Sequence, residues 1–271
     1  MAISTDGQFL EFARFKLASV DRRTPDDVVI EGIHRSNTWT AVATHAVFRI
    51  GVTVTLDPSQ EASFWQIGVR CGALTPVLLN FGKFVDEPYM LTSRVRGTHP
   101  KAAPPQAGKF LRLLHEYAPD GFGPKGNWPP RRDHRFSTAI AYLQGRWPEK
   151  RALLRLIDLA SVQFAEEKIC PNHGDFRTEN MLTDPGGGFG LVDWTDAHLG
   201  SREEDLGGCD PELIPEIVRS YQGDAPVALS REKIAGHSYA RVLSLMAAGV
   251  LPQESLGPTE CALSDFLSQS V

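Results

Sequence analysis

Three oxygen-bearing side chains, Asp175, Asn180 and Asp193, lie close together in the sequence at spacings that suit a shared site. Residues 181–183 and 189–192 read as short strands, because the Asp-Pro-Gly-Gly-Gly sequence between them is strong turn chemistry. An antiparallel hairpin brings its two ends together, so Asn180 at its entry and Asp193 at its exit are expected to lie side by side. Asp175 is on the loop just before. Carboxylate and amide oxygens suit a hard divalent cation, and the sequence therefore predicts a cation site beside one free carboxylate.

The elements that must position this site begin with a β-rich region. Residues 9–20 carry apolar side chains at helical spacing and predict an amphipathic helix. Residues 28–54 are rich in β-branched and aromatic side chains with polar alternation, which indicates two or three antiparallel strands. A helix is expected to begin at Asp57, and residues 76–95 read as two further strands around a turn. The first part of the chain is thus a small sheet with one helix inserted between its strands.

After Gly97 the pattern changes, through a proline-containing linker, to helices. Apolar side chains recur at helical spacing in residues 106–118, 153–164, 212–222 and 230–248. We therefore expect an α+β protein of two lobes. Residues 1–95 are the predicted N-terminal lobe, and residues 96–271 are the predicted C-terminal lobe.

Composition excludes several classes of protein. The formal net charge of −5 favours no nucleic-acid partner, and no run of apolar residues is long enough to span a membrane. The N-terminus has acidic residues and no apolar stretch of signal-peptide length, so a cytoplasmic protein is expected. The four cysteines show no close pairing, which favours reduced thiols. We expect a monomer or a weak dimer.

Several short motifs together resemble the signature of the aminoglycoside phosphotransferase and choline kinase family. They are His173-Gly174-Asp175, Asn180, Leu191-Val192-Asp193-Trp194, Ala197-His198-Leu199-Gly200 and Asp205-Leu206. The resemblance implies a protein-kinase-like bilobal fold, with a small antiparallel-sheet N-lobe containing one helix and a larger, mainly helical C-lobe. It also implies transfer of the terminal phosphoryl group of ATP or GTP to a hydroxyl of a small molecule.

The resemblance implies a role for each residue of the motif. Asp175 would orient the acceptor hydroxyl or accept its proton, as the catalytic-loop aspartate of kinases does. Asn180 and Asp193 would hold Mg²⁺ against the nucleotide phosphates. His173 is expected to be a structural part of the catalytic loop, and Asp205 is expected to tether that loop through backbone hydrogen bonds.

The N-terminal lobe departs from the family pattern at its phosphate grip. Kinases pair a strand lysine with a helix glutamate, and here Arg49 and Glu61 match those positions. Arginine can hold both a carboxylate and a phosphate, although a strand-end surface residue is the alternative reading of Arg49. Ser36 is a candidate phosphate contact. The resemblance also implies a hinge between the lobes near Ser93 to Val95, where backbone groups would bind adenine.

Two further charged features have alternative readings. Arg177 follows Asp175 closely enough to stabilise the negative charge that develops on the transferring phosphate, but it could equally pair with a surface carboxylate. The acidic run at residues 203–216 is expected to be a solvated surface, or else an attraction for a cationic acceptor.

The sequence thus predicts a Mg²⁺-dependent kinase of small molecules, with an aminoglycoside-type antibiotic as one expected acceptor and antibiotic resistance as the consequence. A metabolic kinase acting on a choline-like, sugar or amino-alcohol acceptor is the alternative enzyme. A nucleotide-binding pseudokinase without catalysis is the alternative outside the enzymes, which the intact Asp175, Asn180 and Asp193 set argues against.

Overall fold

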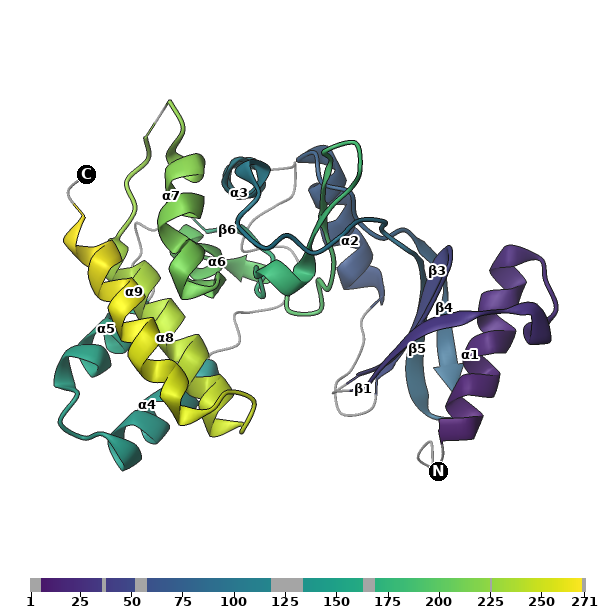
Figure 1. Ribbon diagram of the computed structural model, residues 1–271, viewed down its shortest axis with the longest axis horizontal. Helices are drawn as coiled ribbons and strands as arrows, with labels where there is room; N and C mark the ends of the chain where they lie inside the picture. Colours follow the sequence, from purple (N-terminus) through teal and green to yellow (C-terminus); the bar gives the residue numbers. More distant parts are fainter. Residues whose placement is uncertain are drawn as a thin grey trace.

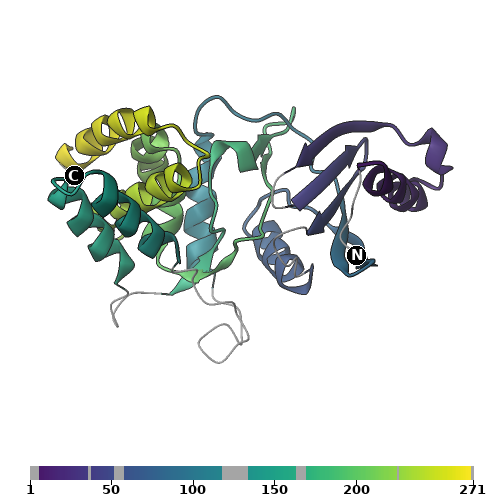
Figure 2. The same cartoon turned by 90° about the horizontal axis from the view of Figure 1, so that it is seen from below.

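The computed structural model describes residues 6–35, 38–51, 58–117, 134–162, 169–224 and 226–269. Two lobes lie side by side, as Figures 1 and 2 show: one built around a sheet and one built from helices. The sheet has five antiparallel strands in the order β1-β2-β3-β5-β4. Their bounds are β1 (Ile30–Arg35), β2 (Thr38–Ala43), β3 (Ala46–Gly51), β4 (Leu78–Phe84) and β5 (Glu87–Ser93).

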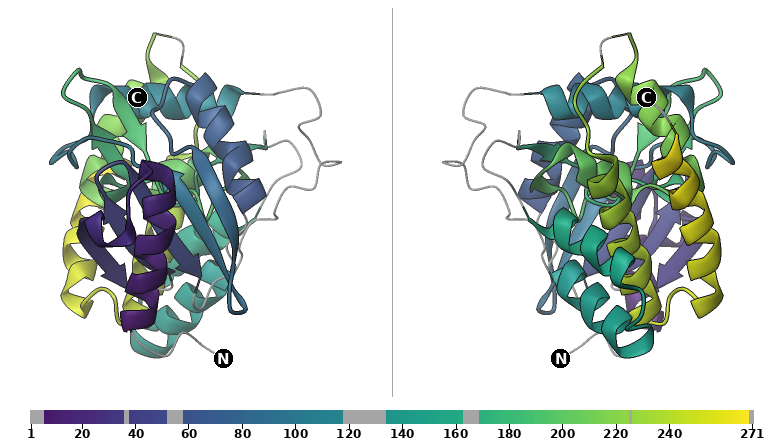
Figure 3. Two further views of the ribbon diagram at one scale, coloured as in Figure 1. Left: turned by 90° about the vertical axis from the view of Figure 1, so that its right-hand side faces the viewer. Right: turned by 90° about the vertical axis from the view of Figure 1, so that its left-hand side faces the viewer.

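Side chains along strand β3 alternate between a face that packs in the core and a face that carries a charged residue. Phe48 and Ile50 are fully buried in a cluster with Phe9 and Leu17 of helix α1 (Asp6–Asp21). Helix α1 covers this face of the sheet, as the left view of Figure 3 shows. Because successive side chains of a strand point to opposite faces, Arg49 points away from α1, toward helix α2 (Pro58–Arg70). The strand therefore places the Arg49 guanidinium in the interior of the molecule.

A short hairpin lies between the lobes. Strands β7 (Met181–Thr183) and β8 (Phe189–Leu191) pair antiparallel, and the turn is closed by Asp184, whose carboxylate accepts the Gly188 N–H. Single bridges connect the hairpin to Leu74 and to Thr98. Strands β6 (Cys170–Asn172) and β9 (His198–Gly200) form a second antiparallel pair. In the sequence, β6 precedes the hairpin and β9 follows it. The hairpin is thus fixed to both parts of the chain.

The second lobe is helical and contains the larger core, in which α2 also takes part through Phe64 and Ile67. Its helices α8 and α9 are in front in the right view of Figure 3. The helices are α3 (Pro105–Glu116), α4 (His134–Arg146), α5 (Arg151–Ser161), α6 (Arg202–Gly208), α7 (Ile214–Gln222), α8 (Arg231–Ala247) and α9 (Leu256–Ser268). Short 3₁₀ turns are η1 (Pro25–Asp27), η2 (Thr178–Asn180), η3 (Pro211–Leu213) and η4 (Gln253–Ser255).

The α+β architecture with a small antiparallel-sheet lobe and a larger helical lobe is confirmed, as is the predicted hairpin. The boundary at residues 95 and 96 stays a prediction. Within the described ranges, no helix is both long and apolar enough to cross a membrane. Helices α4, α6 and α9 are additional to the helices that the sequence predicts.

Close helix packing predicts a contrast between two glycines. A Cβ at Gly108 in α3 would lie 2.0 Å from Ser220 Oγ and 2.4 Å from the Ile217 carbonyl oxygen of α7, whereas one at Gly145 in α4 would meet nothing within 4 Å. Gly108→Ala should therefore lower the free energy of unfolding by about 2 kcal/mol or more. Gly145→Ala should leave it unchanged or raise it by up to about 1 kcal/mol, since alanine favours helices. Urea unfolding of both variants checks this, and equal effects would contradict the packing described.

Candidate active site

The loop that carries Asp175 has a backbone only glycine can adopt comfortably. Gly174 has φ +82°, and a Cβ there would lie 2.1 Å from the carbonyl oxygen of Asp196. Two hydrogen bonds fix the loop: the backbone N–H groups of His173 and Gly174 each donate to the Asp205 carboxylate at 2.8 Å. These are the backbone bonds expected of Asp205.

Asp205 lies in a closed polar environment and not on a solvated surface. It is 1% exposed, and His115 Nε2 lies 3.3 Å from its Oδ2. Burial opposes its charge, but His115, His173 and the Gly174 amide outweigh burial and lower the pKa of Asp205 below its ordinary value. Glu204 is also buried, 3.2 Å from His198. The prediction of a solvated acidic run is therefore wrong at these two residues.

His173 connects the loop to the hairpin. Its Nε2 donates to the Val192 carbonyl at 3.0 Å, and its Nδ1 accepts the Asp175 backbone N–H at 3.3 Å. Its ring packs edge-on against Trp194, with centroids 4.7 Å apart, and both residues are fully buried. Since both ring nitrogens bond to backbone groups, His173 has a structural position here.

Asp175 and Asn180 are joined directly. Asn180 Nδ2 donates to the backbone carbonyl of Asp175 at 2.8 Å and to its carboxylate Oδ2 at 2.9 Å. The backbone carbonyl of Asn180 accepts the Val192 N–H at 2.9 Å, so the hairpin holds Asn180 beside Asp193 as the sequence predicts. The Asp175 carboxylate remains partly open to solvent, with its side chain 20% exposed.

Asp193 has a left-handed backbone, with φ +59°, which aspartate tolerates better than most residues. Its Oδ1 accepts from Arg49 Nη2 at 3.0 Å and from Thr195 Oγ1 at 2.8 Å. Partial desolvation by the surrounding protein opposes its charge, but Arg49 and Thr195 lower the pKa of Asp193 below its ordinary value. Its side chain is 46% exposed, so it remains open to a ligand.

The oxygens of this set fit Mg²⁺. Both amide hydrogens of Asn180 are used by Asp175, which leaves the Asn180 amide oxygen for a cation, and no hydrogen bond within the described chain occupies Asp193 Oδ2. No cluster of three His, Cys, Asp or Glu side chains in the described ranges could hold a metal. Two protein oxygens completed by phosphate and water are the usual magnesium arrangement, and the donor set fits it.

Arg49 is shared between two carboxylates. Its Nη1 lies 3.2 Å from Glu61 Oε2, while its Nη2 contacts Asp193 and Thr195. Arg49 is 13% exposed and Glu61 2%, which excludes the reading of Arg49 as a surface residue. Burial raises the pKa of Glu61 to about 7, since the single arginine charge is shared with Asp193.

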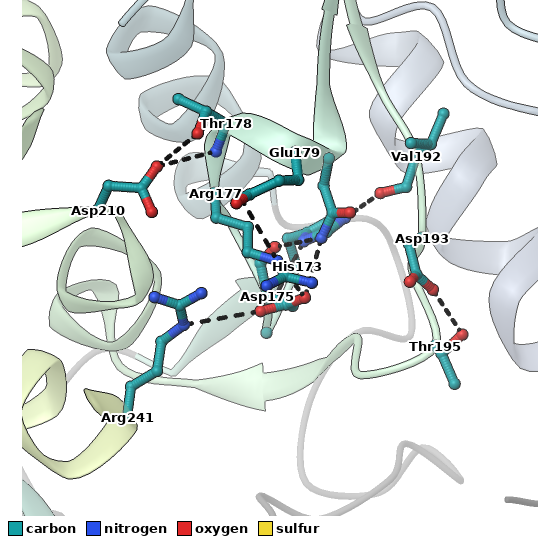
Figure 4. A network of polar contacts seen from close by, with 12 residues as sticks. His173, Asp175, Arg177, Thr178, Glu179, Val192, Asp193, Thr195, Asp210 and Arg241 are labelled. Atoms are coloured by element: carbon teal, nitrogen blue, oxygen red, sulfur yellow. Dashed lines mark hydrogen bonds and ion pairs between the residues drawn. The ribbon is translucent and has the colours of Figure 1, made fainter. Parts of the chain in front are cut away.

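Figure 4 shows the arrangement around Asp175, with Arg177 and Arg241 beside its carboxylate and Asp193 on the far side from Arg241. Arg177 Nε lies 3.1 Å from Asp175 Oδ2 and 3.8 Å from Glu179 Oε2, so it is adjacent to the Asp175 carboxylate and also close to an exposed one. Both readings of Arg177 agree with this position.

The hinge residues differ in what they can still bind. The backbone N–H of Ser93 is bonded to the Val77 carbonyl at 2.8 Å, and its hydroxyl accepts the Val77 N–H. Val95 makes no backbone hydrogen bond within the described residues. Of the two residues, Val95 therefore has the backbone groups that are more available to an adenine ring. Ser36 lies outside the described residues.

Three residues near the site were missed by sequence reasoning: Thr195, Arg135 and Arg241. Thr195 fixes Asp193, and Arg135 Nη2 donates to the Gly174 carbonyl at 3.3 Å. Arg241 is 8% exposed in the middle of the largely buried helix α8. An arginine among the apolar residues of that helix was the available signal.

A family model described as the phosphotransferase enzyme family (APH) matches residues 64–221, more than half of the chain. The chain belongs to this phosphotransferase family. The matched residues include the whole catalytic loop and hairpin but begin after Arg49 and Glu61. The resemblance drawn from the motifs is therefore confirmed. No curated protein sequence matches the chain.

Solved structures of phosphotransferases are similar over nearly the whole chain. A choline/ethanolamine kinase family protein from Mesorhizobium loti has 19% identity and a TM-score of 0.60, covering 95% of this chain and 93% of that one. An aminoglycoside phosphotransferase, APH(4)-Ia, with ADP and hygromycin B has 14% identity and a TM-score of 0.62, covering 93% and 96%. APH(2")-IIa with streptomycin and ATP has 14% identity and a TM-score of 0.55, covering 99% and 98%. These similarities confirm the protein-kinase-like fold.

The buried carboxylate of Asp205 predicts an acid-sensitive contribution to stability. Asp205→Asn keeps the shape but loses the charge, and should lower the free energy of unfolding at pH 7 by about 2–4 kcal/mol. Because the pKa of Asp205 is lowered on folding, the wild-type advantage is complete well above about pH 4 and is lost as the pH falls through the folded value.

Urea unfolding at pH 7 and pH 3 measures this difference. The gap between wild type and Asp205→Asn should shrink at pH 3. The matched variant Asp158→Asn, on an exposed position of α5, should stay within about 0.5 kcal/mol of wild type. A gap that grows on acidification would contradict the assignment.

Proposed function

We propose that this chain is a Mg²⁺-dependent small-molecule kinase that moves the terminal phosphoryl group of ATP or GTP to a hydroxyl. The observation that carries the proposal is the convergence of Asp175, Asn180 and Asp193 on one loop and hairpin. The Asp175 carboxylate is left partly open, and neither the Asn180 amide oxygen nor Asp193 Oδ2 is hydrogen-bonded within the described chain. Nucleotides in the titles of similar structures support a nucleotide donor.

Asp175 orients the acceptor hydroxyl and receives its proton. Phosphoryl transfer needs positioning and charge neutralisation more than covalent help from the protein. The Asn180 amide and Arg177 hold the Asp175 carboxylate in place, and the two N–H bonds to Asp205 fix the backbone beneath it. The proton acceptor therefore needs little reorganisation during the reaction.

Asn180 and Asp193 would hold Mg²⁺ through their side-chain oxygens. When bound, the metal neutralises charge on the nucleotide phosphates. Arg49 adds a fixed positive charge beside Asp193, and Glu61 keeps Arg49 in that position. Ser36 is proposed as a further phosphate contact, and the Val95 backbone, with Ser93 beside it, as the adenine site.

Arg177 is proposed to stabilise the charge that develops on the transferring group. Its guanidinium lies beside Asp175, where the acceptor oxygen and the phosphorus must meet. Residues 1–95 and 96–271 are proposed as the two lobes. A cytoplasmic location, a monomer or weak dimer, and the lack of a nucleic-acid partner remain predictions from the sequence.

The acceptor class has two candidates among the similar structures. Hygromycin B and streptomycin appear with aminoglycoside phosphotransferases, which favours an antibiotic acceptor and a role in resistance. The choline/ethanolamine kinase family protein favours a metabolic acceptor. All are below 20% identity, so neither candidate is preferred by likeness alone.

Replacement of the proposed catalytic carboxylate tests the function. Asp175→Asn should reduce acceptor-dependent release of nucleoside diphosphate by about 100-fold or more, because the amide cannot take the hydroxyl proton. Nucleotide binding should change little, since Asp175 is not proposed to contact the nucleotide. A coupled assay over aminoglycosides, choline-like amines, sugars and hydroxy acids measures the rate.

Asp158→Asn is the matched control, an exposed aspartate changed in the same way, and it should keep full activity. Full activity in Asp175→Asn would contradict the assignment of Asp175 as the proton acceptor. Nucleotide binding without transfer by the wild type to any acceptor would instead favour the pseudokinase.

A further inference from the structure

The acceptor side of Asp175 contains a buried cation. Arg241 lies in the middle of helix α8, is 8% exposed, and places its Nε 3.8 Å from Asp175 Oδ1. Figure 4 shows that Arg241 approaches Asp175 from the side opposite to Asp193. In-line transfer requires the acceptor to reach the phosphorus from the side opposite to the leaving nucleoside diphosphate, whose proposed position is beside Asp193. Arg241 is therefore on the side from which the acceptor approaches.

Two further arginines lie close to Asp175. Arg177 Nε lies 3.1 Å from Asp175, and Arg135 donates to the Gly174 carbonyl from helix α4. The charged groups that act most strongly on Arg241 are these two arginines and two carboxylates, those of Asp175 and Asp210. Asp210 is itself occupied, since it accepts from the Thr178 hydroxyl at 2.6 Å and from the Thr178 N–H at 3.2 Å. Three guanidinium groups thus lie near three carboxylates, those of Asp175, Asp210 and the exposed Glu179.

Three residues of the acidic run are held by structural contacts. Glu203 accepts the Ser230 N–H at 3.1 Å, and Glu204 lies 3.2 Å from His198. Asp205 holds the catalytic loop. Residues 203–205, the first part of the acidic run, are therefore occupied by structural contacts, whereas Glu212 and Glu216 are exposed.

Arg241 is only partly compensated. Its 3.8 Å separation from Asp175 is beyond hydrogen-bond range, and no other ion pair of Arg241 is found in the described part of the chain. Burial lowers the pKa of Arg241 below its ordinary value, which Asp175 opposes. A buried guanidinium with a weak partner is stabilised when an anion binds it, because arginine matches carboxylate and phosphate in a bidentate geometry.

We propose that the acceptor is a hydroxyl compound carrying an anionic group, carboxylate or phosphate, and that Arg241 binds that group. The inference rests on the proposed kinase function. The acceptor hydroxyl oxygen attacks the terminal phosphorus, and the bond from that phosphorus to the bridging oxygen breaks. The nucleoside diphosphate leaves with the electron pair, and the hydroxyl proton passes to Asp175. Arg241 is thus a specificity-determining residue, and polycationic antibiotics are poor acceptors.

Acceptors that differ in charge but share a hydroxyl test the proposal on the whole protein. Glycerol is the neutral probe, glycerate and glycerol phosphate are the two anionic probes, and ethanolamine and streptomycin are the cationic probes. Release of nucleoside diphosphate and the mass of the product give kcat and KM for each. The expected result is a kcat/KM at least about 10-fold higher for one of the anions than for glycerol, with the cations lower still.

Arg241→Gln should raise the KM of the preferred anion about 10-fold or more, with nucleotide KM within about twofold of wild type. Arg241→Lys should recover part of the loss, a rescue that a purely structural role would not give. Arg155→Gln, an exposed arginine of α5, is the matched control and should change neither KM. Thermal melting and nucleotide binding establish whether each variant is folded. If Arg241→Gln does not fold, the ranking of acceptors by the wild-type protein still tests the proposal.

Two failures can be told apart. Transfer that prefers glycerol or the cations, or an anion KM unchanged in Arg241→Gln, overturns the anionic acceptor but leaves the kinase function standing. No Asp175-dependent transfer to any class of acceptor overturns the kinase function and the anionic acceptor with it.

Discussion

One guanidinium shared between two carboxylates connects the lobes at the point where chemistry is expected. Arg49 comes from the sheet, Glu61 from α2, and Asp193 from the segment after the hairpin. Strand alternation points Arg49 inward, and burial prevents it from leaving, because an unpaired charge there is costly. Sharing one cation leaves Asp193 ionised but not fully neutralised, so it keeps the capacity to bind a metal ion.

The loop that carries Asp175 depends on a second buried network. Asp205 accepts two backbone N–H bonds from the loop, and His115 supports it from α3. His173 then connects the loop to the hairpin through the Val192 carbonyl. Asp175 is the member left partly open to solvent. Rigid support beneath a partly open carboxylate is what proton transfer at a fixed distance requires.

Local sequence was sufficient for the features set by backbone chemistry. The Asp-Pro-Gly-Gly-Gly turn predicts the hairpin, and the hairpin places Asn180 beside Asp193 without further information. Burial of Asp205 could not be predicted this way, because its partner His115 is distant in sequence. The same holds for Arg241, which only the packing of α8 brings to Asp175. Charged residues buried by long-range pairing are where reasoning from a single sequence fails, since local pattern assigns them to the surface.

The central claim is that Asn180 and Asp193 form the metal site of a nucleotide-dependent kinase. A crystal grown with Mn²⁺ and a non-hydrolysable ATP analogue tests it through the anomalous signal of the metal. The account predicts a peak within about 2.5 Å of the Asn180 amide oxygen and the Asp193 carboxylate, bridging to the phosphates. A metal bound elsewhere, or phosphates bound with no metal between these two side chains, would contradict it.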